Sequence, residues 1–427
     1  MPSVSPALAL TDHVSAPRLL SLIEDLARFG ARSDGGVDRQ ALAAAEFDAR
    51  RFLVGYAQSL GCDVLHDAAG NLFFRRAGLE SAAPVLTGSH IDTQPAGGKL
   101  DGAYGVCAGL EVIAAMRDAR VRPRRPLEVV VWSNEEGCRF APGSMGSAAF
   151  VRPDRLPEFR ATRDVAGISY GDCVDRLREA MSMYAIQTCD LARPIHAFIE
   201  AHIEQGPVLE QLRVPIGIVT GVQGVRWFRL YALGQAAHAG TTPIEYRCDA
   251  MRTLVAIASE AYAMAERTPD LRLTVGTLQL TPGSINTIPG EATMTIDVRH
   301  PRLDTLDRCA NLLRNFCTTS QHGCQVTVKE IMALPTTWFD DSVKSSILQA
   351  AQAQRLAVRE MISGAFHDSV HLAGHCPTGM IFVPSRAGIS HNPDEHTEAG
   401  DLVAGARVLA GAVALQAGLL PDRETCP

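Results

Sequence analysis

The chain has 427 residues, of which 46% are hydrophobic and 20% are charged. This length predicts two domains with substantial cores, and this composition excludes a disordered chain or a fibrous repeat. Its 40 Lys and Arg residues against 47 Asp and Glu residues give a formal net charge of −7 without a basic run, so neither nucleic acid nor an anionic membrane is expected as a partner.

The first half of the chain alternates predicted helices and strands. Apolar residues at helical spacing predict helices at residues 16–60 (two helices), 106–116 and 163–184. Short apolar runs predict strands at residues 63–65, 71–74, 84–87, 127–132 and 197–204. Strands separated by helices predict a parallel or mixed central sheet with helices on its faces.

Near residue 213 the sequence becomes rich in β-strand patterns. The strands expected there are residues 216–222, 224–233, 271–280, 291–299 and 324–331, and the helices are residues 248–267 and 303–316. Residues 213–332 therefore predict a two-layer α+β domain. It interrupts a discontinuous α/β domain formed by residues 1–212 and 333–427.

The two ends of the sequence and its cysteines indicate in which cellular compartment the protein is expected. The most apolar segment, residues 402–420, contains Arg407 and Gln416, which predicts a buried helix rather than a membrane span. The N-terminal residues lack the pattern of a secretion signal. The eleven cysteines form no C-x-x-C pair, which is typical of free thiols in a reducing compartment. We therefore expect a cytoplasmic protein without a transmembrane helix.

Histidines and carboxylates follow the ends of several predicted strands. They are His90 and Asp92, Asp101 beyond a glycine-rich turn, Glu135 and Glu136, His202 and His391. In open α/β sheets ligands bind outside the carboxyl ends of the strands, so we expect these side chains to converge. Histidine and carboxylate groups that converge from independent strands predict a metal site.

Spacing within these groups predicts a division of roles. In His90-x-Asp92 both side chains lie on one side of an extended segment, so Asp92 can accept the ring N–H of a metal-binding His90. Asp101 lies among glycines, and its two oxygens can bridge two cations. Adjacent Glu135 and Glu136 would repel each other unless a cation neutralises one, which favours one ligand beside one general base.

Each pattern also has a more ordinary interpretation. A lone His-x-Asp is usually a surface or capping pair, and adjacent glutamates usually lie on a solvated helix, although these follow a buried run of Val and Trp. His367, His371 and His375 are spaced by four, as on one helical face, but lack the glutamate of an H-E-x-x-H motif. We expect this triple to be structural, with His367 near the site.

Seven motifs together resemble a known enzyme family. They are residues 88–106 (G-S-H-I-D-T-Q-P through G-G-K-L-D-G to G-V), 132–141 (W-S-N-E-E-G-C-R-F-A), 202–207 (H-I-E-Q-G-P), 234–243 (G-Q-A-A-H-A-G-T-T-P), 286–289 (N-T-I-P), 297–299 (D-V-R) and 390–398 (S-H-N-P-D-E-H-T-E). In this order they resemble the N-carbamoyl-L-amino-acid hydrolase and allantoate amidohydrolase family. That family is part of the wider superfamily of dinuclear aminoacylases and carboxypeptidases. The resemblance covers residues 18–420.

The resemblance implies how the polar residues hold two cations. One ion would be bound by His90, Asp101 and His202. The other would be bound by Asp101, Glu136 and His391, with Asp101 shared between them. Glu135 would be the general base, which takes a proton from water and passes it to the leaving nitrogen. Two divalent ions per subunit are expected, Zn²⁺ first, with Mn²⁺, Co²⁺ or Ni²⁺ also compatible with these donors.

The resemblance also implies substrate contacts and a homodimer. His238 matches a residue that reaches the site of the partner subunit and polarises the scissile carbonyl. Gln205, Asn286 and Arg299 match positions that bind a substrate carboxylate, for which a guanidinium group is well suited. The inserted domain would act as the lid and form the dimer.

The expected activity is hydrolysis of an N-carbamoyl amino acid to the amino acid, ammonia and carbon dioxide. The alternatives are an N-acyl amino acid amidohydrolase or dipeptidase of the same superfamily, or an allantoate, ureidoglycolate or 3-ureidopropionate amidohydrolase. One position departs from the family pattern, because Phe366 stands where the family usually has glycine. An added phenyl ring would reshape the substrate pocket if it lies beside the site.

Overall fold

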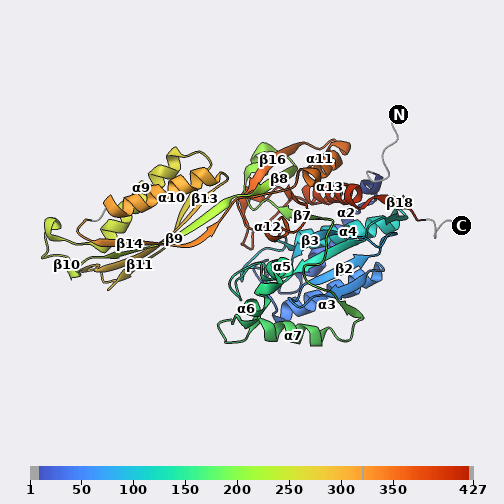
Figure 1. Ribbon diagram of the computed structural model, residues 1–427, viewed down its shortest axis with the longest axis horizontal. Helices are drawn as coiled ribbons and strands as arrows, with labels where there is room; N and C mark the ends of the chain where they lie inside the picture. Colours follow the sequence, from blue (N-terminus) through green and yellow to red (C-terminus); the bar gives the residue numbers. More distant parts are fainter. Residues whose placement is uncertain (1–8, 320–321, 423–427) are drawn as a thin grey trace. The chain divides into compact units, whose positions relative to one another are not determined.

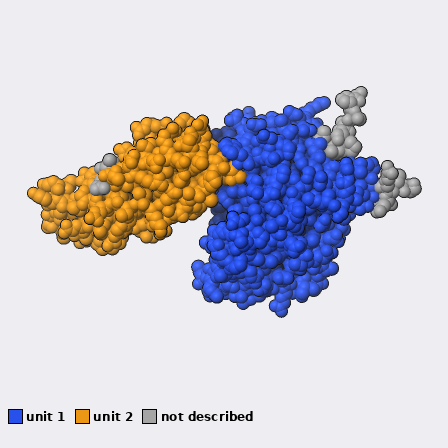
Figure 2. Space-filling model, viewed as in Figure 1, with its two compact units in different colours: residues 1–220, 338–427 blue, residues 221–337 orange. Residues whose placement is uncertain are grey.

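The computed structural model describes residues 9–319 and 322–422. The chain divides into two compact units, residues 1–220 with 338–427 and residues 221–337 (Figure 2). This division differs from the expected insert of residues 213–332. Strand β8 (Ile216–Val222) pairs antiparallel with β17 (Thr378–Val383), so backbone hydrogen bonds attach it to the large sheet of unit 1.

Unit 1 is built on a ten-stranded mixed sheet (Figure 1). Its strands, besides β8 and β17, are β1 (Asp63–His66), β2 (Leu72–Arg76), β3 (Val85–His90), β5 (Leu127–Trp132), β6 (Ile186–Thr188), β7 (Ala197–Ile203), β15 (Thr337–Trp338) and β16 (Val358–Ser363). The order is β15-β8-β17-β7-β3-β5-β2-β1-β6, with β16 paired to β8. Neighbours β17, β7, β3 and β5 run parallel, whereas β2 and β8 pair antiparallel with β5 and β17. The expected mixed sheet is confirmed.

Helices cover both faces of this sheet. The helices of unit 1 are α2 (Ala16–Ala27), α3 (Ala44–Ser59), α4 (Ala103–Asp118), α5 (Met145–Val151), α6 (Leu156–Ala161), α7 (Tyr170–Ala180), α8 (Val208–Leu212), α11 (Asp341–Ala353), α12 (Ser369–Leu372) and α13 (Ala399–Ala417). Along β5, Val129 and Val131 belong to the core that contains α4 and α13. The alternate residues Val130 and Trp132 belong to the core that contains Phe150 of α5. This alternation is the two-residue period of a strand buried on both faces.

The C-terminal apolar segment forms helix α13. By length and composition it is the one described helix that could cross a membrane, and 61% of its apolar window is buried inside the protein. It packs against α11 and α4 in the core of unit 1. The expectation of a buried helix is therefore confirmed.

The three histidines spaced by four do not share a helix. Helix α12 covers only residues 369–372, so His371 is helical whereas His367 and His375 lie on either side of it. Helical spacing predicted one continuous face here, and that prediction is wrong because the helix is a single turn.

Unit 2 is a two-layer α+β structure. Its antiparallel sheet has the order β11 (Arg272–Thr281), β13 (Glu291–His300), β9 (Gly224–Leu233) and β14 (Gln325–Leu334). Helices α9 (Ala250–Arg267) and α10 (Leu303–Thr319) share one hydrophobic core with this sheet. A short ladder joins β10 (Ala237–His238) to β12 (Thr287–Ile288).

Close packing of α13 predicts unequal effects of two glycine substitutions in the same helix. A Cβ at Gly405 would lie well inside van der Waals distance of the Tyr104 hydroxyl and of Val383, whereas a Cβ at Gly400 meets nothing within 4 Å. Gly405→Ala should lower the free energy of unfolding by about 1–3 kcal/mol. Gly400→Ala should leave it unchanged or raise it by up to about 1 kcal/mol. Urea denaturation measures both, and equal values would contradict the described packing.

Candidate active site

Most of the candidate residues lie at or just beyond the carboxyl ends of four neighbouring parallel strands of the large sheet. His90 is the last residue of β3, His202 lies near the end of β7, and His391 follows β17 in the chain. Glu135 and Glu136 follow the end of β5. Because the strands are adjacent and parallel, their carboxyl ends meet, and these side chains come together there.

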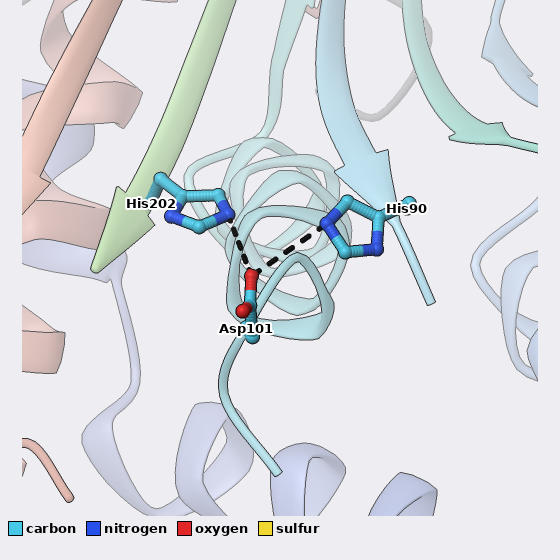
Figure 3. A group of neighbouring side chains, drawn as sticks. All are labelled: His90, Asp101 and His202. Carbon is cyan, nitrogen blue, oxygen red and sulfur yellow. Dashed lines mark ion pairs between the residues drawn. The ribbon is translucent and has the colours of Figure 1, made fainter. Parts of the chain in front are cut away.

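Asp101 lies at the centre of this group, immediately before α4. Its Oδ1 atom is 3.1 Å from Nε2 of His202 and 3.6 Å from Nε2 of His90 (Figure 3). Its Oδ2 atom is 3.2 Å from Nε2 of His391, which in turn is 3.6 Å from Oε2 of Glu136. The structure therefore contains two groups of three ligand atoms that share Asp101.

Ring orientations of the two buried histidines suit metal binding. Nδ1 of His90 is 2.9 Å from the main-chain oxygen of Asp92, and Nδ1 of His202 is 2.8 Å from that of Ile203. A carbonyl can only accept, so we assign the proton to Nδ1 in each ring. In the neutral ring that binds a metal, the lone pair of each Nε2 atom therefore faces Asp101; in the doubly protonated ring, Nε2 donates to Asp101 instead.

The distances between ligand atoms also fit divalent cations. Ligands about 2.1 Å from a tetrahedral ion are about 3.4 Å from one another. Three ligand atoms lie 3.1 to 3.6 Å from the oxygens of Asp101, and His391 lies 3.6 Å from Glu136. Imidazole nitrogens and carboxylate oxygens are the donors that Zn²⁺ and similar ions prefer. The residues present therefore fit two ions with Asp101 between them.

Asp92 has a different partner from the one expected. Its carboxylate accepts the main-chain N–H groups of Glu135 (3.2 Å) and Glu136 (3.1 Å). Nδ1 of His90 is closer to the main-chain oxygen of Asp92, at 2.9 Å, than to its carboxylate, at 3.6 Å. Asp92 thus orients His90 through its backbone, and its side chain holds the two glutamates in place.

The adjacent glutamates occupy different surroundings. Both oxygens of Glu136 accept hydrogen bonds from Gln94, from the main-chain N–H at 3.1 Å and from Nε2 at 2.7 Å. Burial and the nearby Asp101 raise the pKa of Glu136 to about 7. Glu135 belongs to neither group of three; its Oε2 atom is 3.6 Å from Nε2 of His90. Burial raises the pKa of Glu135 well above its usual range, and the charge of Asp368 contributes.

Charges around Asp101 are strongly interdependent. Burial opposes ionisation of Asp101, but hydrogen bonds from three histidines outweigh it and hold the pKa of that carboxyl well below its usual value. Contact with Asp101 in turn raises the pKa of His391 to about 8. Protons on histidine thus balance the buried carboxylates of this group, and a divalent ion would displace those protons.

Gln205 contacts Asp101 rather than an open surface. It adopts a left-handed backbone conformation (φ 57°), and its Nε2 atom donates to Oδ2 of Asp101 at 2.8 Å. Its Oε1 atom is buried without a hydrogen-bond partner among the described residues. The expected contact of Gln205 with a substrate carboxylate stays a prediction.

The other three expected substrate residues lie in unit 2. Nδ1 of the exposed His238 accepts N–H groups of Gly240 and Thr241, so a neutral ring carries its proton on Nε2 and can donate it. Asn286 contacts Ser284 through its side-chain oxygen. The guanidinium of Arg299 pairs with Asp297 on the same strand, at 2.7 Å. Their roles toward a substrate stay predictions.

His367 and Phe366 contact two different histidines. His367 is buried, and its ring centroid is 4.6 Å from that of His202, so it lies next to the site as expected. The half-buried ring of Phe366 packs against His371, with centroids 5.5 Å apart.

Sequence reasoning did not single out two residues that contact the ligands. Gln94 holds Glu136, and the buried carboxylate of Glu395 accepts N–H groups of Leu100 and Asp101. Glu395 lies within the 390–398 motif that carries His391. Its place in this motif was the only feature of the sequence that indicated a role at the site.

Comparison with known proteins defines the family. Residues 86–415 match peptidase family M20/M25/M40. An N-carbamoyl-L-amino-acid amidohydrolase of Rhizobium meliloti is 34% identical, with 94% of this chain and 96% of the relative covered. Allantoate amidohydrolase of Bacillus subtilis (strain 168) is also 34% identical, covering 91% and 94%. A hydantoinase/carbamoylase family amidase from Burkholderia multivorans has a TM-score of 0.89 at 39% identity, covering 95% and 98%.

This chain therefore belongs to peptidase family M20/M25/M40. It is similar over nearly its whole length to carbamoylases and allantoate amidohydrolases, which confirms the resemblance found in its motifs. The expectation of an amidohydrolase from this metal-dependent family is likewise confirmed.

The shared carboxylate predicts unequal metal loss in two variants. Asp101→Asn removes the negative charge common to both groups of three, so both ions should be bound at least tenfold more weakly. His391→Ala removes a ligand from one group only and should leave one ion bound. Elemental analysis of purified variants after dialysis against a metal buffer measures the stoichiometry. Two tightly bound ions in Asp101→Asn would contradict the assignment.

Proposed function

We propose that this protein hydrolyses the carbamoyl C–N bond of an N-carbamoyl amino acid and releases the amino acid, ammonia and carbon dioxide. The observation that carries the proposal is a carboxylate, Glu135, that stands beside two groups of three metal ligands without belonging to either. Relatives named N-carbamoyl-L-amino-acid amidohydrolase support this substrate class.

Chemistry at this site needs a base and electrostatic stabilisation. Two divalent ions held by His90, Asp101, His202, Glu136 and His391 would supply Lewis acidity, which acidifies water and polarises a ureido carbonyl. Glu135 takes the proton of the attacking water and later donates it to the departing nitrogen, which leaves as ammonia. The carbamate left on the nitrogen of the amino acid then loses carbon dioxide and gives the free amino acid. Burial of Glu135, which favours its protonated form, suits the second of these steps.

Four further residues are proposed to contact the rest of the substrate. Arg299 binds the substrate carboxylate with Asn286 and Gln205, because a planar guanidinium matches two carboxylate oxygens. His238 donates from Nε2 to the developing oxyanion of a partner subunit's site, which requires a homodimer formed by unit 2. Allantoate and ureidoglycolate have the same ureido group, and relatives named for these substrates support them as alternatives.

The metal and the compartment complete the proposal. Zn²⁺ is the proposed ion because its ligand preferences match two histidines and a carboxylate, with Mn²⁺, Co²⁺ and Ni²⁺ as alternatives for the same donors. The cytoplasm is the proposed compartment, supported by the ten cysteines of the described ranges, all of which are free thiols.

Replacement of the proposed base should separate binding from turnover. Glu135→Gln keeps the shape of the side chain but cannot take a proton. It should lower kcat by about 10²–10⁴-fold, as is typical for loss of a general base. Metal content should remain that of the wild type, since Glu135 is not a ligand. A variant with nearly normal kcat would exclude Glu135 as the base.

The substrate class is tested by a screen of metal-reconstituted protein. We expect N-carbamoyl-L-amino acids to release ammonia and free amino acid in equal amounts, whereas N-acetyl amino acids and dipeptides should release little product. Allantoate, ureidoglycolate and 3-ureidopropionate belong in the same screen. Preferred turnover of N-acyl substrates without ammonia release would overturn the proposal in favour of an aminoacylase.

A further inference from the structure

Glu395 is a buried carboxylate that contacts the loop carrying Asp101. Only 4% of its surface is exposed. Its Oε1 atom accepts the main-chain N–H groups of Leu100 at 2.9 Å and of Asp101 at 3.1 Å. Its Oε2 atom accepts the hydroxyl of Ser390 at 2.7 Å. The side chain therefore contacts a ligand's own backbone but not the proposed ions.

These contacts join two separate ligand loops. Asp101 lies between β3 and α4, whereas Ser390 directly precedes His391. The Ser390 hydroxyl is also 3.3 Å from Oδ2 of Asp101. Glu395 and Ser390 thus fix the loop of Asp101 against the loop of His391, and these two residues must lie at a set distance to share a cation.

The Asp101 loop passes directly over the Glu395 side chain. A Cβ at Gly98 would overlap the carboxylate and Cβ atoms of Glu395. Only glycine allows so close an approach, so Gly98 serves this contact. The close approach brings the N–H groups of Leu100 and Asp101 within reach of one carboxylate oxygen.

The Glu395 carboxylate is held by hydrogen bonds and not by a direct ion pair among the described residues. Within the described residues it forms no ion pair with Lys, Arg or His, and its bonds are to two main-chain groups and one hydroxyl. A buried carboxylate without a counterion costs free energy. Divalent ions on the other side of Asp101 would compensate that cost.

We infer that Glu395 is a positioning residue that presents Asp101 to both cations and strengthens their binding. This inference rests on the proposed metal centre. Through its bonds to the backbone, Glu395 fixes where the Asp101 carboxylate stands, and its negative charge adds to the field that attracts cations. Groups that orient metal ligands typically contribute 10- to 100-fold to metal affinity.

Asp67 provides a matched control in the same unit. Its carboxylate is fully buried and accepts main-chain N–H groups of Ala69 at 2.9 Å and Asn71 at 3.0 Å, and the Asn71 amide at 2.7 Å. Like Glu395 it accepts two main-chain N–H groups and one side-chain donor, here an amide in place of a hydroxyl, but it contacts none of the proposed ligands. Asp67→Ala reports what loss of such an anchor does to stability alone.

The experiment titrates metal-free full-length protein with Zn²⁺ against a chromophoric chelator. Glu395→Ala should bind Zn²⁺ about 10- to 100-fold more weakly than the wild type. Glu395→Gln keeps an acceptor for the two N–H groups but has no charge. Its Zn²⁺ affinity should lie between those of the wild type and Glu395→Ala. Asp67→Ala should keep wild-type affinity despite a lower Tm. If Glu395→Ala is insoluble, Glu395→Gln and Ser390→Ala test the same bonds.

Two outcomes would overturn the inference. Wild-type Zn²⁺ affinity in both Glu395 variants would mean that the residue does not act on the metal centre. An equal loss in Asp67→Ala would mean that the effect is general destabilisation. Because the titration uses Zn²⁺ alone, a protein without activity on carbamoyl substrates but with weakened binding in Glu395→Ala would refute the proposed function and leave this inference intact.

Discussion

The candidate site depends on the carboxylate of Asp101, which contacts ligand atoms of both groups. One oxygen faces His202 and His90, and the other faces His391. Three basic groups around one buried carboxylate keep it ionised even where burial opposes the charge. Glu135 and Glu136 each lie 3.6 Å from one of these histidines rather than against all three, so the charge of the centre is balanced either by protons or by divalent cations. Metal affinity should therefore depend on pH, because protons and metal ions compete for the same side chains.

Strand geometry makes this arrangement possible. The adjacent parallel strands β5, β3, β7 and β17 bring residues from distant parts of the chain to one edge. Glycines then allow the Asp101 loop to approach, since a Cβ at Gly102 would lie 2.5 Å from the ring of His90. Gly102 also has a positive φ of 64°, which other residues rarely adopt. The strands thus fix the positions of the histidines, and the glycine beside Asp101 lets the loop that carries its carboxylate approach them.

Sequence patterns predicted the fold class and the convergence of the polar residues, because apolar strands followed by histidines or glutamates have a known geometry in α/β sheets. They could not predict that β8 belongs to the large sheet rather than to the insert, since a strand pattern does not reveal its pairing partner. They misassigned the side-chain partner of His90, because Asp92 contacts it through the backbone. Glu395 was missed because a buried carboxylate held by main-chain N–H groups has no spacing signature.

The most direct measurement of the shared carboxylate is a crystal structure of the Mn²⁺-loaded protein with anomalous difference maps. This account predicts two peaks about 3.5–4 Å apart, one on each oxygen of Asp101, with Glu135 bound to neither. A single peak, or two peaks with Asp101 bound to only one of them, would contradict it.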